Sequence, residues 1–527
     1  MVSRAGESEG TRTRGLARST AIFSFWTGIS RIAGLAREIL VAALYGTQGT
    51  ISAFVIAFQV PNLLRSLVAD SALSAAFVPV YTELQEKGRH KEAQRLAGAM
   101  LGVTTIGLGA LTLVAIVLAP WFMPFFAPGL SDDLIDETIR LARLMFPIVV
   151  LLGITGIVFA ILQAANDFGP TAFAPVLWNA LIILCLAIAA PLFPDGSARI
   201  TVYAVGILIG TVGQLIYVAW NVRGLGPFPL SLRLSSSVKR VLVMMLPVTI
   251  GLGLINVNLS VDALFATLVS EQAPRAIDAA FRLYLLPQGV FSVAVATVLF
   301  PTISRLVARG DMSGVRSSIA DGLRMIFFIL LPAAAFLLLL AEPIVRLVFQ
   351  YGEFNAESTD LTSESLLFFA LGLVFNGASL LLIRAFFSLQ EPWIPTIVAG
   401  GGVVLNVLLD FALYRPLGIG GIPLATSLVS FVTFLILAFL LAHRLDGIHG
   451  GRVLDGIIRT TIIAAMTGVL AWSTWYLIES ALGQGFVAQV IALGGASVAG
   501  LAGFVAGARG LEMPEMSRLS ALVRARR

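Results

Sequence analysis

Ser30-Arg31-Ile32-Ala33-Gly34-Leu35-Ala36-Arg37-Glu38 lies inside an apolar run that extends from residue 17 to residue 45. Three charged side chains therefore fall within a segment long enough to cross a membrane. An arginine at the centre of such a helix costs roughly 3 kcal/mol on insertion scales, so it usually faces a protein interior or a wet cavity. The stretch predicts a membrane helix whose cations meet something negatively charged.

The composition of the 527-residue chain agrees with this prediction. Hydrophobic residues make up 57% of the chain and charged residues 12%, about half the charged share of an average soluble domain. Apolar runs recur from near residue 17 to about residue 508, which predicts an all-α integral membrane protein. No hydrophilic block is longer than a loop, so we expect no separate soluble domain and no nucleic-acid partner.

The apolar runs predict about fourteen transmembrane helices. Their expected limits are 17–45, 52–80, 92–120, 135–164, 173–192, 201–221, 240–270, 276–305, 318–349, 360–389, 393–413, 418–443, 456–479 and 485–508.

Loop charges predict an even number of spans with both termini in the cytoplasm. Cytoplasmic loops of membrane proteins are rich in Lys and Arg. Here basic residues gather in alternate loops, after the second, sixth, eighth and twelfth spans, and in the tail; the first of these loops holds Lys87, Arg89, Lys91 and Arg95. Because one missed span would reverse every later loop, this alternation supports the count.

A faint internal repeat predicts two six-helix lobes followed by two added helices. Pro61, Arg65 and Pro79 of the second span echo Arg282 and Pro301 of the eighth, as halves related by a pseudo-repeat would. The expected parts are a cytoplasmic N-terminal tail (1–16), an N-lobe (17–221), a cytoplasmic linker (222–239), a C-lobe (240–443), a helix pair (456–508) and a basic cytoplasmic tail (509–527).

The charges of the first span divide between two expected roles. On an ideal helix, Arg31 and Glu38 fall on nearly one face, while Arg37 points about 120° away. We therefore expect Glu38 to support Arg31 and Arg37 to face a cavity. The alternative is that the arginines snorkel to the cytoplasmic interface, which is unfavourable for Arg31 at a depth of roughly 21 Å.

Two more arginines lie near prolines inside apolar spans. Arg65 follows Pro61, which favours a helix kink, and Asp70 lies about 140° round an ideal helix, so we assume no pairing. Arg282 precedes Pro287; its alternative role is that of a loop-end arginine at the outer interface. A guanidinium fork donates two parallel hydrogen bonds to phosphate oxygens and stays charged, so these arginines suit a diphosphate.

Oxygen-bearing side chains form a second constellation. Asp262 lies in the middle of the seventh span, and Asn406 and Asp410 share a face of the eleventh at i and i+4, with Thr426 in the twelfth. Carboxylate, amide and hydroxyl oxygens suit a hard, redox-inert cation. By spacing alone, hydrogen bonding between helices explains Asn406 and Asp410 equally well, whereas a buried Asp262 needs a partner or a proton.

The sequence does not place inside the membrane the residues that several classes of chemistry require. The three histidines, His90, His443 and His449, fall in predicted loops, and Cys185 stands alone in an apolar run. The chain also lacks the GxxxxGK[ST] motif of a built-in ATPase. We therefore expect a transporter rather than an intramembrane enzyme on lipid-linked sugars.

Five motifs resemble those of the lipid II flippases called MurJ or MviN, in the multidrug/oligosaccharidyl-lipid/polysaccharide exporter superfamily. The resemblance covers essentially the whole chain, and it implies fourteen helices in two lobes around a cationic cavity, with a lipid-tail groove beside the last two helices. The motifs are SRIAGLARE at 30–38, VPNLLR at 60–65, AFVP at 76–79, APG at 127–129 and FQYG at 349–352.

The resemblance also implies a function. Lipid II, the undecaprenyl-diphosphate-linked peptidoglycan precursor, would move from the cytoplasmic to the outer leaflet of the bacterial inner membrane by alternating access. The implied partners are lipid II and membrane lipids, with other cell-wall synthesis or division proteins as further candidates and a monomer as the expected state. No cofactor is implied beyond a coupling sodium ion, with membrane potential as a second driving force.

The family's functional positions carry over to named residues of this chain. The implied substrate-binding residues are Arg31, Arg37, Arg65 and Arg282, with Glu38 and Asp70 as cavity support. The implied sodium ligands are Asp262, Asn406, Asp410, the backbone carbonyl of Ile422, and Thr426.

Two positions depart from the family. Ser52 stands where members often carry an aspartate, and Leu285 where some carry an acid. Both replacements make the expected cavity more positive. The alternative functions are a flippase for another polyprenyl-diphosphate-linked glycan or a cation-coupled drug exporter, although an arginine-lined cavity suits a cationic drug poorly.

Overall fold

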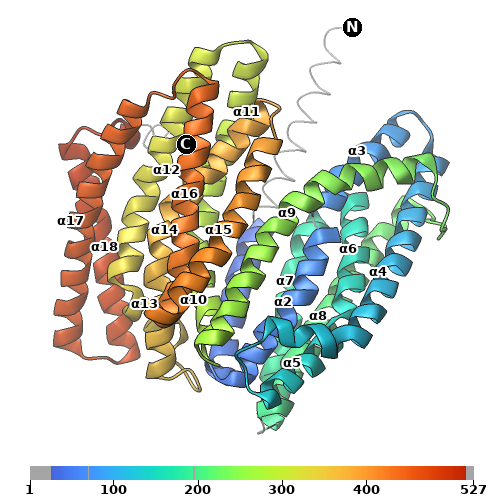
Figure 1. Cartoon of the computed structure of the whole chain (residues 1–527), viewed down its shortest axis with the longest axis horizontal. Coiled ribbons are helices and arrows are strands. Elements are labelled where there is room, and N and C mark those ends of the chain that lie inside the picture. The colour runs from blue at the N-terminus through green and yellow to red at the C-terminus, as the bar shows by residue number, and fades with distance from the viewer. Residues whose placement is uncertain (1–24, 69–70, 166, 194–195, 518–527) are drawn as a thin grey trace. The chain divides into compact units, whose positions relative to one another are not determined.

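A computed structural model describes residues 25–68, 71–165, 167–193 and 196–517, without the side chains of 65–75, 246–248, 250–252 and 255. Within these ranges the regular structure is entirely helical (Figure 1). The chain divides into two compact units, Met1–Thr267 (unit 1) and Leu268–Arg527 (unit 2). The predicted lobe limits, 17–221 and 240–443, stay predictions.

Unit 1 begins with a described helix at residues 25–45. A proline explains where one of its other helices begins. Pro147 occupies the first position of that helix, where the missing N–H of proline does no harm. The helices that follow are α2 (Gly49–Val68), α3 (Ser71–Glu86), α4 (His90–Phe126), α5 (Asp132–Met145), α6 (Pro147–Ala164), α7 (Gly169–Ala189), α8 (Gly196–Val222) and α9 (Ser236–Val269), with short 3-10 turns at Ala190–Leu192 and Arg223–Leu225.

Unit 2 is built around α14, which packs against α10, α11, α12, α13 and α16. Its helices are α10 (Ala273–Pro287), the π-helical turn η3 (Gln288–Ser292), α11 (Val293–Ala308), α12 (Met312–Leu339), α13 (Ala341–Phe349), α14 (Ala356–Ser388), α15 (Trp393–Leu417), the 3-10 turn η4 (Gly418–Gly420), α16 (Gly421–Arg444), α17 (Gly450–Leu482) and α18 (Phe486–Gly510).

The prediction of an all-α membrane protein is confirmed. Ten stretches of the described residues are long and apolar enough to span a membrane, and Gly49–Leu64 and Asn256–Val269 are shorter apolar helices. The stretch Trp393–Arg444 joins two predicted spans through a turn at Gly418, whose φ of 56° suits glycine. The predicted first span corresponds to the helix at residues 25–45. Within the described residues, each of the fourteen predicted spans therefore falls mainly on helix.

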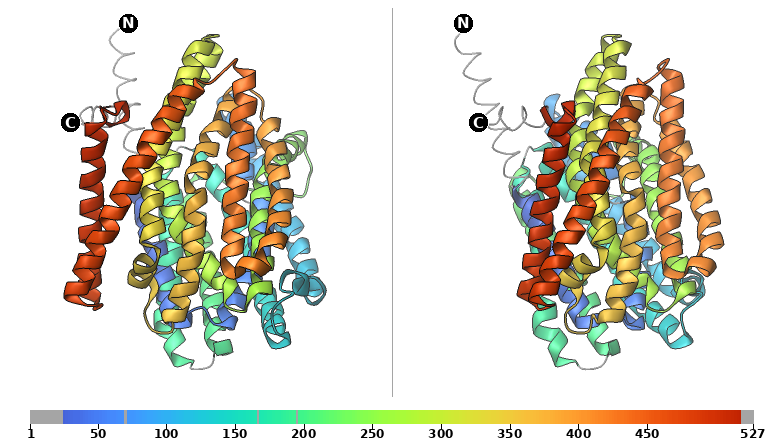
Figure 2. Two further views of the ribbon diagram at one scale, coloured as in Figure 1. Left: turned by 60° about the vertical axis from the view of Figure 1, so that its left-hand side comes forward. Right: turned by 90° about the vertical axis from the view of Figure 1, so that its left-hand side faces the viewer.

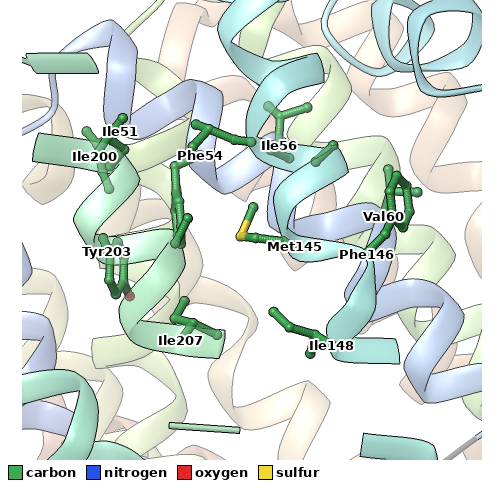
Figure 3. Close-up of a cluster of buried hydrophobic side chains, with 14 of the residues drawn as sticks. Ile51, Phe54, Ile56, Val60, Met145, Phe146, Ile148, Ile200, Tyr203 and Ile207 are labelled. Atoms are coloured by element: carbon green, nitrogen blue, oxygen red, sulfur yellow. The ribbon is translucent and has the colours of Figure 1, made fainter. Parts of the chain in front are cut away.

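A packed apolar cluster in unit 1 joins helices that are distant in sequence (Figure 3). Phe54 of α2 stacks on Tyr203 of α8 with ring centroids 4.3 Å apart. Met145 of α5 and Ile148 of α6 are buried in the same cluster. Because lipid tails are as apolar as these side chains, helix association in a membrane depends on close van der Waals packing rather than on a hydrophobic driving force.

The connection between α8 and α9 lies closely against one face of α4. A Cβ atom built on Gly98 would lie 2.1 Å from the carbonyl oxygen of Pro229, and one on Gly102 would lie 2.5 Å from that of Ser231. Ser231 also donates its backbone N–H to the Gly98 carbonyl at 3.4 Å. Glycines four residues apart on α4 therefore form the shallow channel in which this connection lies.

Replacing Gly98 by alanine is therefore expected to destabilise unit 1. The new methyl group would overlap a backbone oxygen, which cannot move aside as a flexible side chain can, and overpacking of this kind costs about 1–3 kcal/mol. Gly109→Ala on the same helix is the control, because its Cβ would meet nothing within 4 Å and loss of a helical glycine stabilises by about 0.5–1 kcal/mol. Thermal unfolding of the purified proteins measures both; equal midpoints for the two variants would contradict the contact.

An ion-pair cluster joins the end of α3 to the start of α9. The Glu83 carboxylate accepts hydrogen bonds from Lys87 Nζ at 2.6 Å and Arg240 Nη1 at 2.9 Å. These two cations hold the pKa of the Glu83 carboxyl below its usual range. The cluster is solvent-exposed, so it orients the two chain segments more than it stabilises them.

The predicted span 276–305 contains a local irregularity. A π-helical turn, Gln288–Ser292, follows Pro287 directly. Proline removes a backbone donor and displaces the preceding carbonyl, which favours such a wider turn. Gln288 Nε2 donates to Asn376 Oδ1 of α14 at 2.5 Å, so a side-chain hydrogen bond holds the irregular turn against its neighbour.

The last two long helices, α17 and α18, lie side by side and pack against α12 and α13 (Figure 2). Arg346 of α13 donates to Glu479 near the end of α17 at 2.6 Å. Arg324 of α12 donates to Glu515, which follows α18 and is 1% exposed. Charge pairs between elements therefore attach the helix pair to the rest of unit 2.

Candidate functional site

Arg37 is a buried cation in the helix at residues 25–45. Its side chain is 9% exposed, and Nη2 donates to Glu38 Oε1 at 2.7 Å. The guanidinium also lies over the indole ring of Trp178, 4.7 Å from the ring centroid. A desolvated cation over an aromatic face is stabilised by cation–π attraction. One carboxylate and one indole thus fix the guanidinium plane.

Two buried polar atoms at this position have no hydrogen-bond partner among the described residues. They are Arg37 Nε, a donor, and Asn179 Oδ1, an acceptor. Asn179 follows Trp178 on α7, and its Oδ1 would lie 3.9 Å from a Cβ built on Gly34. Buried polar atoms without a partner are uncommon and often mark a place for water or ligand.

The expected support of Arg31 by Glu38 is wrong. Arg31 is exposed, and Glu38 takes Arg37 as its ion-pair partner. Seven residues separate Arg31 from Glu38, a rise of about 10.5 Å along the helix, which is long for a direct pair. Arg37 instead pairs with the adjacent Glu38 while its guanidinium lies over the face of Trp178.

Ser52 lies at the start of α2 and is fully buried. Its hydroxyl oxygen has no hydrogen-bond partner among the described residues. The position is therefore a small buried polar site without a charge. Arg65 belongs to α2 by its backbone, but its side chain lies outside the described residues, as does the whole of Asp70.

Arg282 of α10 is held by a carboxylate one turn earlier. Arg282 Nε donates to Asp278 Oδ2 at 2.9 Å and Nη2 donates to Oδ1 at 3.2 Å, a two-pronged contact. Asp278 therefore supplies an acid beside Arg282, although Leu285 stands where some family members carry one. Sequence reasoning missed Asp278, although its i, i+4 spacing from Arg282 was a usable signal.

Asn406 and Asp410 come together on α15, as their spacing predicts. Both are fully buried, and Asn406 Nδ2 donates to Asp410 Oδ2 at 2.8 Å. Ile422 and Thr426 lie on α16, which packs against α15. The close approach is visible at Gly421, where a Cβ would lie 2.4 Å from the Leu413 carbonyl oxygen.

The donor set of unit 2 fits a hard cation in its chemistry. It comprises the Asp410 carboxylate and the Asn406 amide on α15, together with the Thr426 hydroxyl on α16. Asp262 belongs to α9 of unit 1, where the residue is 5% exposed. Thr267 of the same helix accepts a hydrogen bond from the Gly129 backbone at 3.2 Å.

A separate hollow of about 400 Å³ lies in unit 2. It is lined by Leu268, Val269, Tyr414, Arg415 and Gly418. None of the predicted site residues lines it.

Solved structures of similar fold are membrane transporters. The chain is similar to a structure titled "Lipid II flippase MurJ, inward closed conformation", with a TM-score of 0.78 and 23% identity over 93% of this chain and 99% of that one. It is also similar to an inward-facing multidrug resistance MATE family transporter, with a TM-score of 0.66 and 18% identity over 79% of this chain and 94% of that one. The fold is that of multi-pass helical transporters.

Sequence comparison identifies the family. A family model described as "Lipid II flippase MurJ" matches residues 41–493. A probable lipid II flippase MurJ of Rhizobium meliloti (strain 1021) is 32% identical over 460 residues, covering 85% of this chain and 84% of the relative. The lipid II flippase MurJ of Burkholderia cenocepacia is 29% identical over 439 residues, covering 81% and 84%. The chain belongs to the MurJ lipid II flippase family.

The family match begins beyond the first charged cluster. It starts at residue 41, so Arg37 and Glu38 lie outside it. Their roles therefore rest on burial and contacts in unit 1.

Proposed function

We propose that this chain transports lipid II from the cytoplasmic to the outer leaflet of the bacterial inner membrane. Family membership is the observation that carries the proposal. The work is transport rather than catalysis: no bond of the substrate breaks, and a diphosphate head group crosses while its polyprenyl tail stays in lipid. Alternating access brings the binding residues to each side of the membrane in turn.

Arg37 is the residue we assign to the diphosphate in unit 1. The guanidinium is already oriented by Trp178 and Glu38, so little side-chain entropy is lost when an anion binds. Its unpartnered Nε is a buried donor, and a phosphate oxygen is a strong acceptor for it. In unit 2, Arg282 offers the same chemistry at 36% exposure. Arg31 and Arg65 stay predicted substrate residues.

A sodium ion is the coupling ion that we propose, with membrane potential as a second bias. Asn406 and Asp410 supply buried oxygen ligands, and the Ile422 carbonyl and Thr426 on the neighbouring helix complete the unit 2 set. Asp262 stays the predicted ligand from unit 1. Moving one charge through 100 mV is worth about 2.3 kcal/mol, so either source can shift a two-state equilibrium.

The orientation we propose has both termini in the cytoplasm. Alternation of basic and acidic loops supports it. We also propose that the chain works as a monomer and that cell-wall synthesis or division proteins are its neighbours in the membrane.

The proposal predicts that lipid II reaches the outer leaflet only while this chain is present. Cells are made dependent on the chain and then depleted of it, and lipid II is probed from outside with an enzyme that cleaves exposed substrate. We expect the cleaved fraction to fall on depletion while total lipid II rises, because synthesis continues behind a blocked transport step. A cleaved fraction that does not change on depletion would contradict transport, and a product of altered mass would indicate an enzyme.

A further inference from the structure

Three charged residues form a row on one face of α10, at positions i, i+3 and i+7. The central Asp278 carboxylate accepts hydrogen bonds from both arginines. Oδ2 accepts from Arg275 Nη1 at 3.0 Å and from Arg282 Nε at 2.9 Å, and Oδ1 accepts from Arg282 Nη2 at 3.2 Å. Two cations thus share one anion, and the row carries one excess positive charge.

Burial changes along the row. The exposed fraction of the side chain is 2% for Arg275, 24% for Asp278 and 36% for Arg282. Arg275 therefore belongs to the interior of unit 2, whereas Arg282 can meet a ligand. Asp278 lies between them and contacts both.

The row allows Arg282 to exchange one anion for another. A guanidinium fork matches a carboxylate and a phosphate alike, because both present two oxygens at a similar spacing. When a phosphate takes the fork, Asp278 keeps its hydrogen bond to Arg275, so no carboxylate is stranded without a partner. Leaving a charge unpaired in the interior would be the costly alternative.

We propose that Asp278 is an internal counter-anion that occupies the Arg282 fork until the diphosphate of the substrate displaces it. The inference rests on the proposed function, which assigns Arg282 to the diphosphate. Asp278 acts as a positioning residue that holds Arg282 in a defined rotamer. After transport it pairs with the Arg282 guanidinium again and so promotes release of the substrate. Arg275 is the fixed anchor that keeps the carboxylate in place during the exchange.

The test is Asp278→Asn in the full-length chain in lipid nanodiscs, with undecaprenyl diphosphate as the probe. An amide competes weakly for a guanidinium, so affinity for the probe should rise about three- to fivefold, the fold-change that corresponds to a partly exposed ion pair. Lipid II transport in dependent cells should fall, because release slows. Tighter binding with slower transport is a pair of changes that simple loss of structure does not produce.

Matched variants make the result decisive. Asp278→Glu keeps the charge and should keep the original affinity. Asp455→Asn removes an exposed carboxylate with the same i, i+4 pairing, to Arg459 at 2.9 Å, and should change neither measurement. The variant Asp278→Asn weakens the pairing of the buried Arg275, which can prevent folding. In that case the double variant Arg275→Gln with Asp278→Asn removes both charges and should again bind the probe more tightly.

Unchanged or weaker binding by the folded Asp278 variants would overturn the inference while leaving the proposed function intact. Failure of the unaltered chain to bind undecaprenyl diphosphate, together with a negative leaflet assay, would overturn the proposed function and the inference together.

Discussion

Replacing Arg37 by alanine is expected to abolish growth of cells that depend on this chain for lipid II transport. The change removes the buried guanidinium that Trp178 and Glu38 hold in place, and with it the donor that we assign to the diphosphate in unit 1. Colony formation after depletion of the cells' own flippase is the measurement, at protein levels matched by immunoblot.

The alanine variant has a structural side effect that needs its own control. It removes the Arg37 cation from beside the buried Glu38 side chain, which is 4% exposed, and removing one partner of a buried ion pair costs about 3–5 kcal/mol. The double variant Arg37→Met with Glu38→Gln removes both charges at similar volume, so it should fold and still fail to support growth. Arg37→Lys keeps the charge but loses the fork and the flat stacking surface, so we expect partial function at most. Full growth with the folded double variant would show that Arg37 does not bind the substrate.

Removing sodium is expected to slow lipid II transport, and Asp410→Asn is expected to remove that dependence along with most of the activity. Asp410 is fully buried, where a carboxylate is stable only with a cation, a proton or strong hydrogen bonds. An asparagine keeps the shape and one oxygen but supplies no charge to hold the ion. The measurement is the externally cleaved fraction of lipid II, with sodium replaced by choline at constant ionic strength.

Two results would contradict a sodium site at Asp410. One is equal transport by the unaltered chain in sodium and in choline. The other is an Asp410→Asn variant whose transport still depends on sodium. Asp455→Asn, an exposed change on α17, serves as the control and should behave like the unaltered chain.

The helical architecture was readable from the sequence because the membrane imposes one strong rule. Backbone polar groups have no water to bond with in a bilayer, so long apolar runs must be helices. Local breaks were harder to predict. The run 276–305 reads as one span, yet it contains a π-helical turn after Pro287. The effect of a proline depends on which partners the groups around it can hydrogen-bond with, and these come from tertiary packing. Here Gln288 donates a hydrogen bond to Asn376, which is 88 residues away in the chain.

The sequence predicted which residues belong to the candidate site better than it predicted which of them contact one another. Asn406 and Asp410 pair as their i, i+4 spacing predicts. The helical wheel, by contrast, assigned Glu38 to Arg31, because a wheel records angle and ignores how far a side chain can bend. Arg37 pairs with the adjacent residue, and Trp178 from another helix covers it. No angle within the first span could have revealed that indole, since tertiary packing supplies it.

The ion pair between Arg324 and Glu515 determines where the chain can be shortened or extended. Glu515 follows the last long helix, yet it is buried against α12. A deletion that stops at the end of α18 would look harmless on a hydropathy plot, but it would leave the Arg324 guanidinium buried without its carboxylate. Purification tags and reporter fusions at the C-terminus therefore belong beyond Glu515, and the functional boundary of this membrane protein lies past its last transmembrane helix.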